Sequence, residues 1–215
     1  MALLKQGPSR GFRAPRCPCC NLLLPLCICA HLRLEPASIH VVLLRHPNEA
    51  LRASGTGFLA LRCLGAELLQ VDQVEARLAQ GFAPPAALLF PPDGEECFKE
   101  IALGNPAPSV DMAAFMAVQT LIVPDGSWSE ARRMVRRDPL LRTLPRVTLA
   151  PCEPWLDQPL RSDKWGRPCT AEAVGQLLAQ RGDALAGENL KRCLREFVNA
   201  HWMARGRIPS DPPGS

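Results

Sequence analysis

The chain has 215 residues, of which 47% are hydrophobic and 21% are charged, and its formal net charge is +4. These values are ordinary for a folded protein with one α/β domain and a small appendage, and they exclude a disordered or fibrous chain. No apolar run approaches the roughly 20 residues of a membrane span, and residues 1–15 lack the apolar stretch of an export signal. We therefore expect a cytoplasmic protein without a membrane partner.

Five of the ten cysteines lie in residues 17–29. Four of them have the spacing C-x2-C-x6-C-x-C and are Cys17, Cys20, Cys27 and Cys29. Four thiolates in tetrahedral geometry suit zinc and leave no position open for water, so we expect a structural Zn²⁺ site in residues 16–34. Cys19 is an alternative ligand, and an iron–sulfur cluster or uncoordinated thiols are the competing interpretations.

Beyond this segment, apolar patterns typical of strands and helices alternate along the chain. We predict strands at residues 38–45, 67–71, 86–90, 120–123 and 146–150. We predict helices at residues 57–65, 72–80, 111–118, 170–180 and 188–203, and one more beginning at Ser127. Pro91 and Pro124 are expected to end the strands before them.

This alternation predicts an α/β fold, with a mostly parallel sheet covered by helices on both faces. Ligands of such sheets bind beyond the carboxyl ends of the strands. Three loops are therefore candidates for a binding site: residues 91–96, 124–128 and 150–170.

The helix that begins at Ser127 has the clearest sequence signals. Ser127 and Glu130 match a capping box, and Trp128, Ala131 and Val135 share one face. Beside that face lie four arginines, Arg132, Arg133, Arg136 and Arg137, and arginines gather again at Arg192, Arg195, Arg205 and Arg207. Such clusters suit contacts with RNA phosphates, although a solvated helix face has the same composition.

Four blocks of the chain resemble the DTW-domain family. Residues 125–128, Asp-Gly-Ser-Trp, follow an apolar strand and are similar to the Asp-x-Thr-Trp motif that gives the family its name. The cysteine motif, residues 46–56 and residues 169–173 match further family blocks in the same order. The departures are Ser127 in place of threonine, Gly55 in place of asparagine and Cys169 in place of serine.

This resemblance implies a fold related to the SPOUT methyltransferases, with a knotted sheet that holds S-adenosylmethionine. It also implies the activity of a tRNA-uridine aminocarboxypropyltransferase, which moves the 3-amino-3-carboxypropyl group of S-adenosylmethionine to N3 of a uridine in tRNA and releases methylthioadenosine. The competing functions are a SPOUT-like RNA methyltransferase and a zinc-containing RNA-binding module without catalysis.

Asp125 is the candidate catalytic residue, as a base or orienting acceptor at a strand end; the alternative is a cap that bonds backbone amides. Trp128 is placed either against a base of the substrate or in the core. His46 and Glu49 follow the first strand and could contact either RNA or S-adenosylmethionine, but a satisfied surface pair is the simpler expectation. The candidate contacts to S-adenosylmethionine, which rest mostly on the resemblance, are Pro91, Pro92, Asp93, Asp125, Gly126, Ser127, Trp128, Thr170 and Glu172. Thr170 is alternatively a helix N-cap, with Glu172 in the first turn.

The predicted organisation has four parts. Residues 1–15 are expected to be flexible, residues 16–34 to bind the metal, residues 35–207 to form the catalytic domain and residues 208–215 to be a disordered tail.

Overall fold

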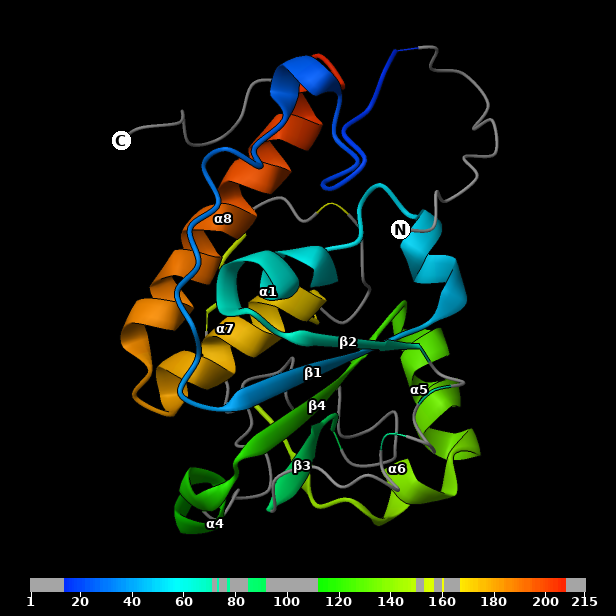
Figure 1. The fold of residues 1–215 in the computed structure, drawn as a ribbon, viewed down its shortest axis with the longest axis vertical. Helices are drawn as coiled ribbons and strands as arrows, with labels where there is room; N and C mark the ends of the chain where they lie inside the picture. Colours follow the sequence, from blue (N-terminus) through cyan, green and yellow to red (C-terminus); the bar gives the residue numbers. More distant parts are fainter. Residues whose placement is uncertain are drawn as a thin grey trace.

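The computed structural model describes residues 14–70, 73, 77, 85–91, 112–149, 153–156, 160 and 167–207. Within these residues, five strands form one sheet in the order β2-β1-β4-β3-β5, and each neighbouring pair is parallel (Figure 1). The strands are β1 (His40–Arg45), β2 (Glu67–Gln70), β3 (Ala86–Leu89), β4 (Thr120–Asp125) and β5 (Arg146–Val147). The predicted α/β class and parallel sheet are confirmed.

Helices occur at most of the predicted places. They are α1 (Gly57–Leu64), α4 (Met112–Ala117), α5 (Trp128–Arg137), α6 (Pro139–Thr143), α7 (Thr170–Gln180) and α8 (Ala184–Met203), with 3-10 turns η1 (Leu24–Leu26) and η2 (Pro47–Leu51). Helix α8 begins four residues before the prediction because Gly187, which we expected to precede it, lies within its first turn. A Cβ at Gly187 would lie 3.1 Å from the backbone oxygen of Gly175, so this glycine lets α8 approach α7 closely. The helix predicted at residues 72–80 lies largely outside the described residues.

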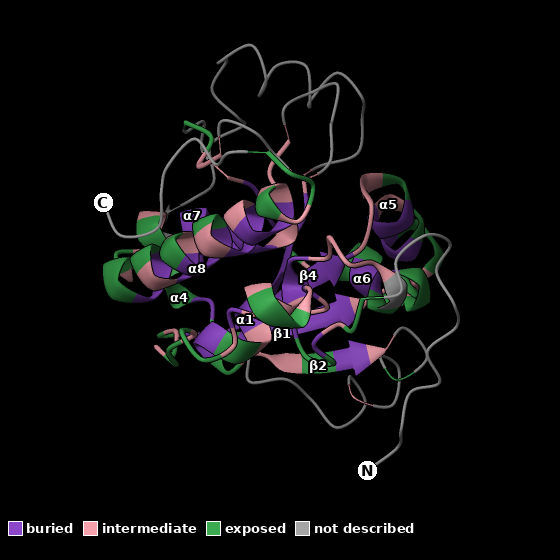
Figure 2. Cartoon of the chain, turned by 90° about the horizontal axis from the view of Figure 1, so that it is seen from above, coloured by how far each residue is buried: buried purple, intermediate pink, exposed green. Residues whose placement is uncertain are grey.

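Helices cover both faces of the sheet. Val41 and Leu43 of β1 belong to a core cluster with α1, α7 and α8, whereas Val42 and Leu44 belong to a second cluster with α5 and α6. The two clusters follow from the alternation of side chains along a strand. Figure 2 shows the buried strands between these two layers. All six residues of β4 are buried, as expected for a central parallel strand.

The prediction that Pro124 ends its strand is wrong. Strand β4 continues through Pro124 to Asp125, and Leu44 of β1 is the partner of Pro124. On its other side, β4 pairs with β3 only as far as Ile122. Pro124 therefore lies where β4 has a single neighbour, a position at which the missing N–H is tolerated.

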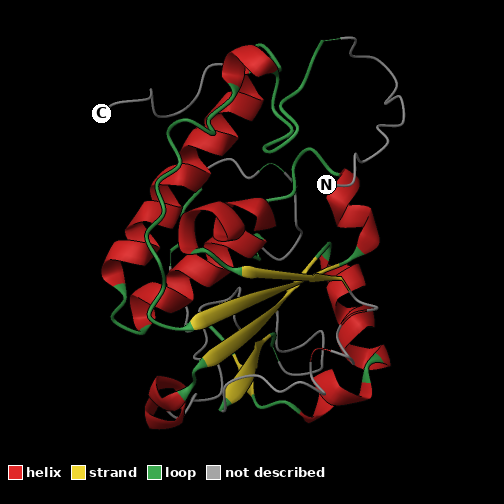
Figure 3. Cartoon of the chain, in the orientation of Figure 1, coloured by secondary structure: helices red, strands yellow, loops and turns green. Residues whose placement is uncertain are grey.

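The cysteine-rich segment joins the domain along α8. The chain from the cysteines to β1 follows this helix, as Figure 3 shows. Asn189 Nδ2 donates to the Arg33 carbonyl over 2.9 Å, and the amide of Ser38 donates to Asp183 Oδ2 over 2.6 Å. The knot stays a prediction, because the connection from β5 to α7 runs through residues outside the described part.

No helix among the described residues is both long enough and apolar enough to span a membrane.

Candidate active site and metal centre

The carboxyl ends of β1 and β4 lie side by side at the centre of the sheet. Arg45, the last residue of β1, is in register with Asp125, the last residue of β4. Beyond them the backbone amide of His46 donates to the Asp125 carbonyl over 2.9 Å. The segment after β1 and the turn after β4 therefore start at one point, which is the edge where parallel sheets bind ligands.

The Asp125 carboxylate is fully buried and both of its oxygens have partners. Arg45 Nε donates to Oδ2 over 3.1 Å, and the Thr170 hydroxyl donates to Oδ1 over 3.0 Å. A Cβ on Gly57, the first residue of α1, would lie 2.3 Å from Oδ2, so only glycine fits there. Burial raises the pKa of Asp125, against the opposing effect of the Arg45 guanidinium.

Helices α1 and α7 both begin at this carboxylate, so the positive ends of their dipoles face it. The Thr56 hydroxyl, at the N-cap of α1, accepts from the Ala171 amide of α7 over 3.3 Å. Thr56 thus serves the neighbouring helix, whose own N-cap, Cys169, makes no side-chain cap bond. The Thr56 hydroxyl therefore forms a crossed cap, which is a cap bond made to the neighbouring helix. Burial raises the pKa of Cys169 to about 11, so its thiol stays protonated.

Glu130 forms a second charged centre beside the first. Arg52 Nη1 lies 2.5 Å from Glu130 Oε2, and Arg52 Nη2 donates to Oε1 over 2.8 Å. The predicted capping box is present: Ser127 is the N-cap of α5, and its amide donates to Glu130 Oε2 over 2.9 Å. The Arg52 guanidinium and these bonds hold the pKa of Glu130 far below its usual range. Glu130 therefore stays ionised and locks the turn that carries Ser127.

The predicted surface pair of His46 and Glu49 is wrong. Glu49 is only 5% exposed, and Arg52 Nη1 donates to its Oε2 over 2.6 Å. His46 Nδ1 instead accepts from the Asn48 amide and lies 3.5 Å from Glu130 Oε1. Sequence reasoning missed Arg52, although its position three residues after Glu49 was an available signal. A Cβ at position 55 would lie 2.9 Å from Glu49 Oε1, so Gly55 leaves room for this buried pair.

Trp128 packs at the end of β3. Its ring lies 5.8 Å from that of Phe90 and against the core cluster under α5, while the Arg167 guanidinium lies 4.6 Å from its centre. Pro91, the next residue after Phe90, accepts from Arg146 Nη1 over 3.2 Å. Trp128 therefore lies beside Phe90, the residue that precedes Pro91, at this end of the sheet. Pro92 and Asp93, also predicted site residues, lie outside the described residues.

Thr170 and Glu172 of α7 point to different places. Thr170 is the first residue of the helix rather than its N-cap, and its hydroxyl reaches Asp125. Glu172 is 5% exposed and accepts the Trp155 amide over 2.6 Å, and burial raises its pKa. Trp155 packs against Gly175, where a Cβ would lie 2.3 Å from its ring. Glu172 therefore anchors the loop before α7, and only Thr170 joins the Asp125 centre.

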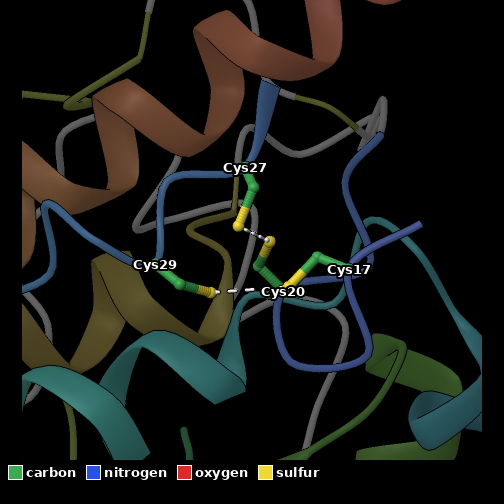
Figure 4. Close-up of side chains that lie close together, drawn as sticks. All are labelled: Cys17, Cys20, Cys27 and Cys29. Carbon is green, nitrogen blue, oxygen red and sulfur yellow. Dashed lines mark hydrogen bonds between the residues drawn. The ribbon is translucent and has the colours of Figure 1, made fainter. Parts of the chain in front are cut away.

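The four predicted metal ligands converge. The sulfur atoms of Cys17, Cys20, Cys27 and Cys29 all lie within 4.8 Å of one another (Figure 4). The Cys17–Cys29 and Cys20–Cys27 pairs are both 3.7 Å apart. A tetrahedron of zinc–sulfur bonds of about 2.3 Å has edges of roughly 3.8 Å, so the four thiols fit Zn²⁺ in spacing and chemistry. Cys19 is exposed and is not among the four converging thiols, which favours the predicted ligand set over one that includes Cys19.

Local backbone contacts explain this convergence. The Cys17 amide donates to the Leu22 carbonyl over 2.8 Å, which closes a tight loop with Asn21 at a positive φ of 59°. Leu22 and Ile28 are buried in the core cluster that includes α8. The loop is therefore fixed both by its own hydrogen bonds and by two apolar anchors between its cysteines.

The four arginines predicted to contact RNA lie on α5. Arg133, Arg136 and Arg137 are exposed, whereas Arg132 is half-buried. Arg136 and Arg137 occupy the last turn of the helix, where a positive charge is favourable. The exposed face of α5 is therefore basic while its inner face is apolar.

Comparisons with known proteins agree with the motifs. A family model described as the DTW domain matches residues 14–201. A mouse protein, tRNA-uridine aminocarboxypropyltransferase 2, is 27% identical over 148 residues, which are 64% of this chain and 46% of the relative. The match thus spans about half the length of that relative. No solved structure matches the chain.

Proposed function

The chain belongs to the DTW domain family, and on that premise we propose that it transfers the 3-amino-3-carboxypropyl group of S-adenosylmethionine to N3 of a uridine in tRNA, releasing methylthioadenosine. The observation that carries the proposal is the position of residues 125–128, the family motif, at the joined carboxyl ends of β1 and β4. The name of the mouse relative, a tRNA-uridine aminocarboxypropyltransferase, supports the same reaction class.

We place S-adenosylmethionine at the carboxyl ends of β3 and β4. Gly126 and Ser127 present the turn, and Trp128 with Pro91 supplies an aromatic and apolar patch suited to adenine. Only the family resemblance supports contacts of S-adenosylmethionine with Pro92, Asp93 and Glu172. Glu172 acts through Trp155, so its role is to position the loop before α7.

Transfer to uridine N3 needs the donor's γ-carbon aligned with the departing methylthioadenosine and the removal of the N3 proton. Alignment alone contributes roughly 7–11 kcal/mol in well-oriented reactions, and a base adds about 10²–10⁴-fold. A base must come within hydrogen-bond distance of N3. In the structure Asp125 is buried, and its two oxygens accept from the Arg45 and Thr170 side chains rather than from backbone amides. This arrangement supports a cap role of another kind, in which Asp125 orients Arg45, Thr170 and the starts of two helices.

The Asp125→Asn variant separates the two roles. If Asp125 is the base, kcat falls by about 10²–10⁴-fold and the acidic limb of its pH profile disappears, while the KM for S-adenosylmethionine is unchanged. If Asp125 is a cap, KM and stability change together and the shape of the pH profile persists. Thr170→Val, which removes one bond to Asp125 and no carboxylate, is the matched control for the cap role.

We further propose that the basic face of α5 contacts tRNA phosphates. Neutralising Arg133 and Arg136 together, both exposed, should reduce the slope of log K against log salt by about 2. A slope equal to that of the unmodified protein would remove these two residues from the RNA surface.

We assign a structural zinc ion to the four cysteines. It would join the chain segments on both sides of η1 and brace the surface next to α8, and with four protein ligands it would take no part in transfer.

The direct test is mass spectrometry of nucleosides from tRNA incubated with the purified protein, with and without S-adenosylmethionine. We expect a uridine heavier by one aminocarboxypropyl group, together with released methylthioadenosine. A gain of one methyl group would favour a methyltransferase. Tight RNA binding with no change in mass would favour a binding module.

A further inference from the structure

A cavity lies between the cysteine-rich segment, the loop after η2 and the carboxyl end of α8. Its volume is about 310 Å³, at the lower end of the range for small-ligand sites. Three arginines line it, Arg16, Arg52 and Arg205, one from each of these regions. The other lining residues are Leu22, Leu23, Ala53, Ser54, His201 and Ala204, so no carboxylate of the described residues faces the cavity.

The charges of these arginines are not equally available. Arg52 is neutralised by Glu49 and Glu130 behind it. Within the described part of the chain, Arg16 and Arg205 form no ion pair with a carboxylate. Two cations that line one cavity repel each other, and an anion bound between them would relieve that repulsion.

Both cations are held in place by protein contacts. Arg16 Nη1 donates to the Asn21 carbonyl over 2.8 Å, within the loop that carries Cys17 and Cys20. The guanidinium of Arg205 lies 4.8 Å from the centre of the Trp202 ring. Arginines fixed in this way lose little conformational entropy when they bind a ligand.

His201 fixes the third wall. It is buried, and its Nε2 lies 2.9 Å from the Ala53 carbonyl, a bond in which the neutral ring donates. Burial lowers the pKa of His201 to about 4, with the charges of Arg205 and Arg16 acting in the same direction. The ring therefore joins α8 to the loop that carries Arg52 without adding a charge of its own.

We propose that this cavity is an anion site that binds one phosphate group through Arg16 and Arg205. The inference rests on the proposed function in one respect: in a tRNA-modifying enzyme the phosphate belongs to the RNA backbone near the target uridine. Arg52 supports this placement, because it lines the cavity and also bonds Glu130. Glu130 in turn holds the turn at Ser127 in the candidate active site. A backbone phosphate bound here would hold RNA next to the candidate active site.

The test compares four proteins for binding to an unmodified tRNA transcript at several salt concentrations: wild type, Arg205→Glu, Arg205→Lys and Arg62→Glu. Arg205 is exposed beyond the end of α8, so its variants should fold. We expect Arg205→Glu to raise Kd several-fold and to reduce the salt slope by about 1, with Arg205→Lys close to wild type. Arg62 is exposed on α1, lies outside both arginine clusters and does not line the cavity, so Arg62→Glu makes the same charge change elsewhere.

A second arm titrates each protein with inorganic phosphate and follows the Trp202 indole signal by NMR. If phosphate perturbs that signal in wild type but not in Arg205→Glu, while Arg205→Glu binds tRNA as wild type does, the site takes a free phosphate compound and the RNA assignment is overturned. Equal losses of tRNA affinity in Arg205→Glu and Arg62→Glu would overturn the proposal, because overall charge would explain them. No response in either arm would also overturn it.

Arg16→Gln gives an independent check, with zinc content measured to show that the cysteine loop is intact. It should weaken tRNA binding as Arg205→Glu does. These measurements report affinity rather than turnover, so they separate the anion site from the proposed function. If wild-type protein shows the expected affinities but transfers no aminocarboxypropyl group, the anion site is supported and the proposed function is contradicted.

Discussion

The cysteine cluster and the charged network at the ends of β1 and β4 are both polar sites, yet they are built in opposite ways. The outermost cysteine pair in contact, Cys17 and Cys29, is 12 positions apart in sequence. In the network, Arg45 and Asp125 are 80 positions apart, and Thr56 and Ala171 are 115 apart. The first site is assembled by one short segment, and the second exists only when the sheet has formed.

The two sites also differ in what neutralises their charge. Four thiolates repel one another and require a cation from solution. The network contains its own cations, Arg45 for Asp125 and Arg52 for Glu130. The cysteine cluster should therefore depend on metal supply, whereas the network should depend on side-chain packing.

Removing one thiolate should have the largest effect. Cys20→Ala takes away a buried ligand and should forfeit much of the stabilisation, about 10 kcal/mol or more, that zinc can give a structural site. Zinc content and the thermal unfolding midpoint, each measured with and without a chelator, report the loss. Cys19→Ala is the control, because Cys19 is exposed and outside the cluster. A Cys20→Ala protein with full zinc content would contradict the claim that the cysteine cluster, unlike the charged network, depends on a metal held by these four thiolates.

Crowding Asp125 should have the next largest effect. In Gly57→Ala the new methyl group would lie 2.3 Å from Asp125 Oδ2, so the carboxylate must move away from Arg45. Disturbing a buried ion pair costs roughly 3–5 kcal/mol, which urea unfolding would detect. The same substitution should cost little in an Asp125→Ala background, where the carboxylate is absent. Equal costs in both backgrounds would show that Gly57 acts through something other than Asp125.

His201 links the two regions and should make stability depend on pH. Its folded-state pKa of about 4 is below the ordinary value of 6.5, so the unfolded chain takes up a proton first as pH falls. The free energy of unfolding should therefore decrease between about pH 6.5 and pH 4, by up to about 3 kcal/mol. His201→Gln keeps a donor for the Ala53 carbonyl but has no titrating ring, so this part of the decrease should be absent from its pH curve. Parallel pH curves for wild type and variant would contradict the assignment.

The smallest effect concerns the capping box of α5. Ser127→Ala removes the acceptor for the Glu130 amide and should lower the free energy of unfolding by about 1 kcal/mol. Ser127→Thr, which restores the residue usual in the family motif, keeps the hydroxyl and should be neutral. A cost for threonine as large as that for alanine would mean that this turn has no space for the extra methyl group.

The contrast also explains how much the sequence could predict. Cysteine spacing and the Ser127–Glu130 box are local patterns, and both were confirmed as structure. The parallel sheet followed from apolar periodicity. Arg45 and Thr56 were not foreseen, because nothing near them in sequence shows that an aspartate 80 positions away and a helix start 115 positions away would be their partners. Pro124 was misjudged because the end of its pairing with β3 depends on sheet register, which local sequence does not show.

The crossed cap between Thr56 and α7 has a consequence for the order in which the protein is made. A ribosome delivers β1 and α1 long before it delivers Thr170 and Ala171. Until α7 emerges, Asp125 lacks the Thr170 hydroxyl as a donor, and the Thr56 hydroxyl lacks the Ala171 amide that donates to it. Pairing across such separations is also slow, since the intervening chain must first be closed into a loop. Nascent chains that stop before α7 should therefore carry the family motif without its completed site.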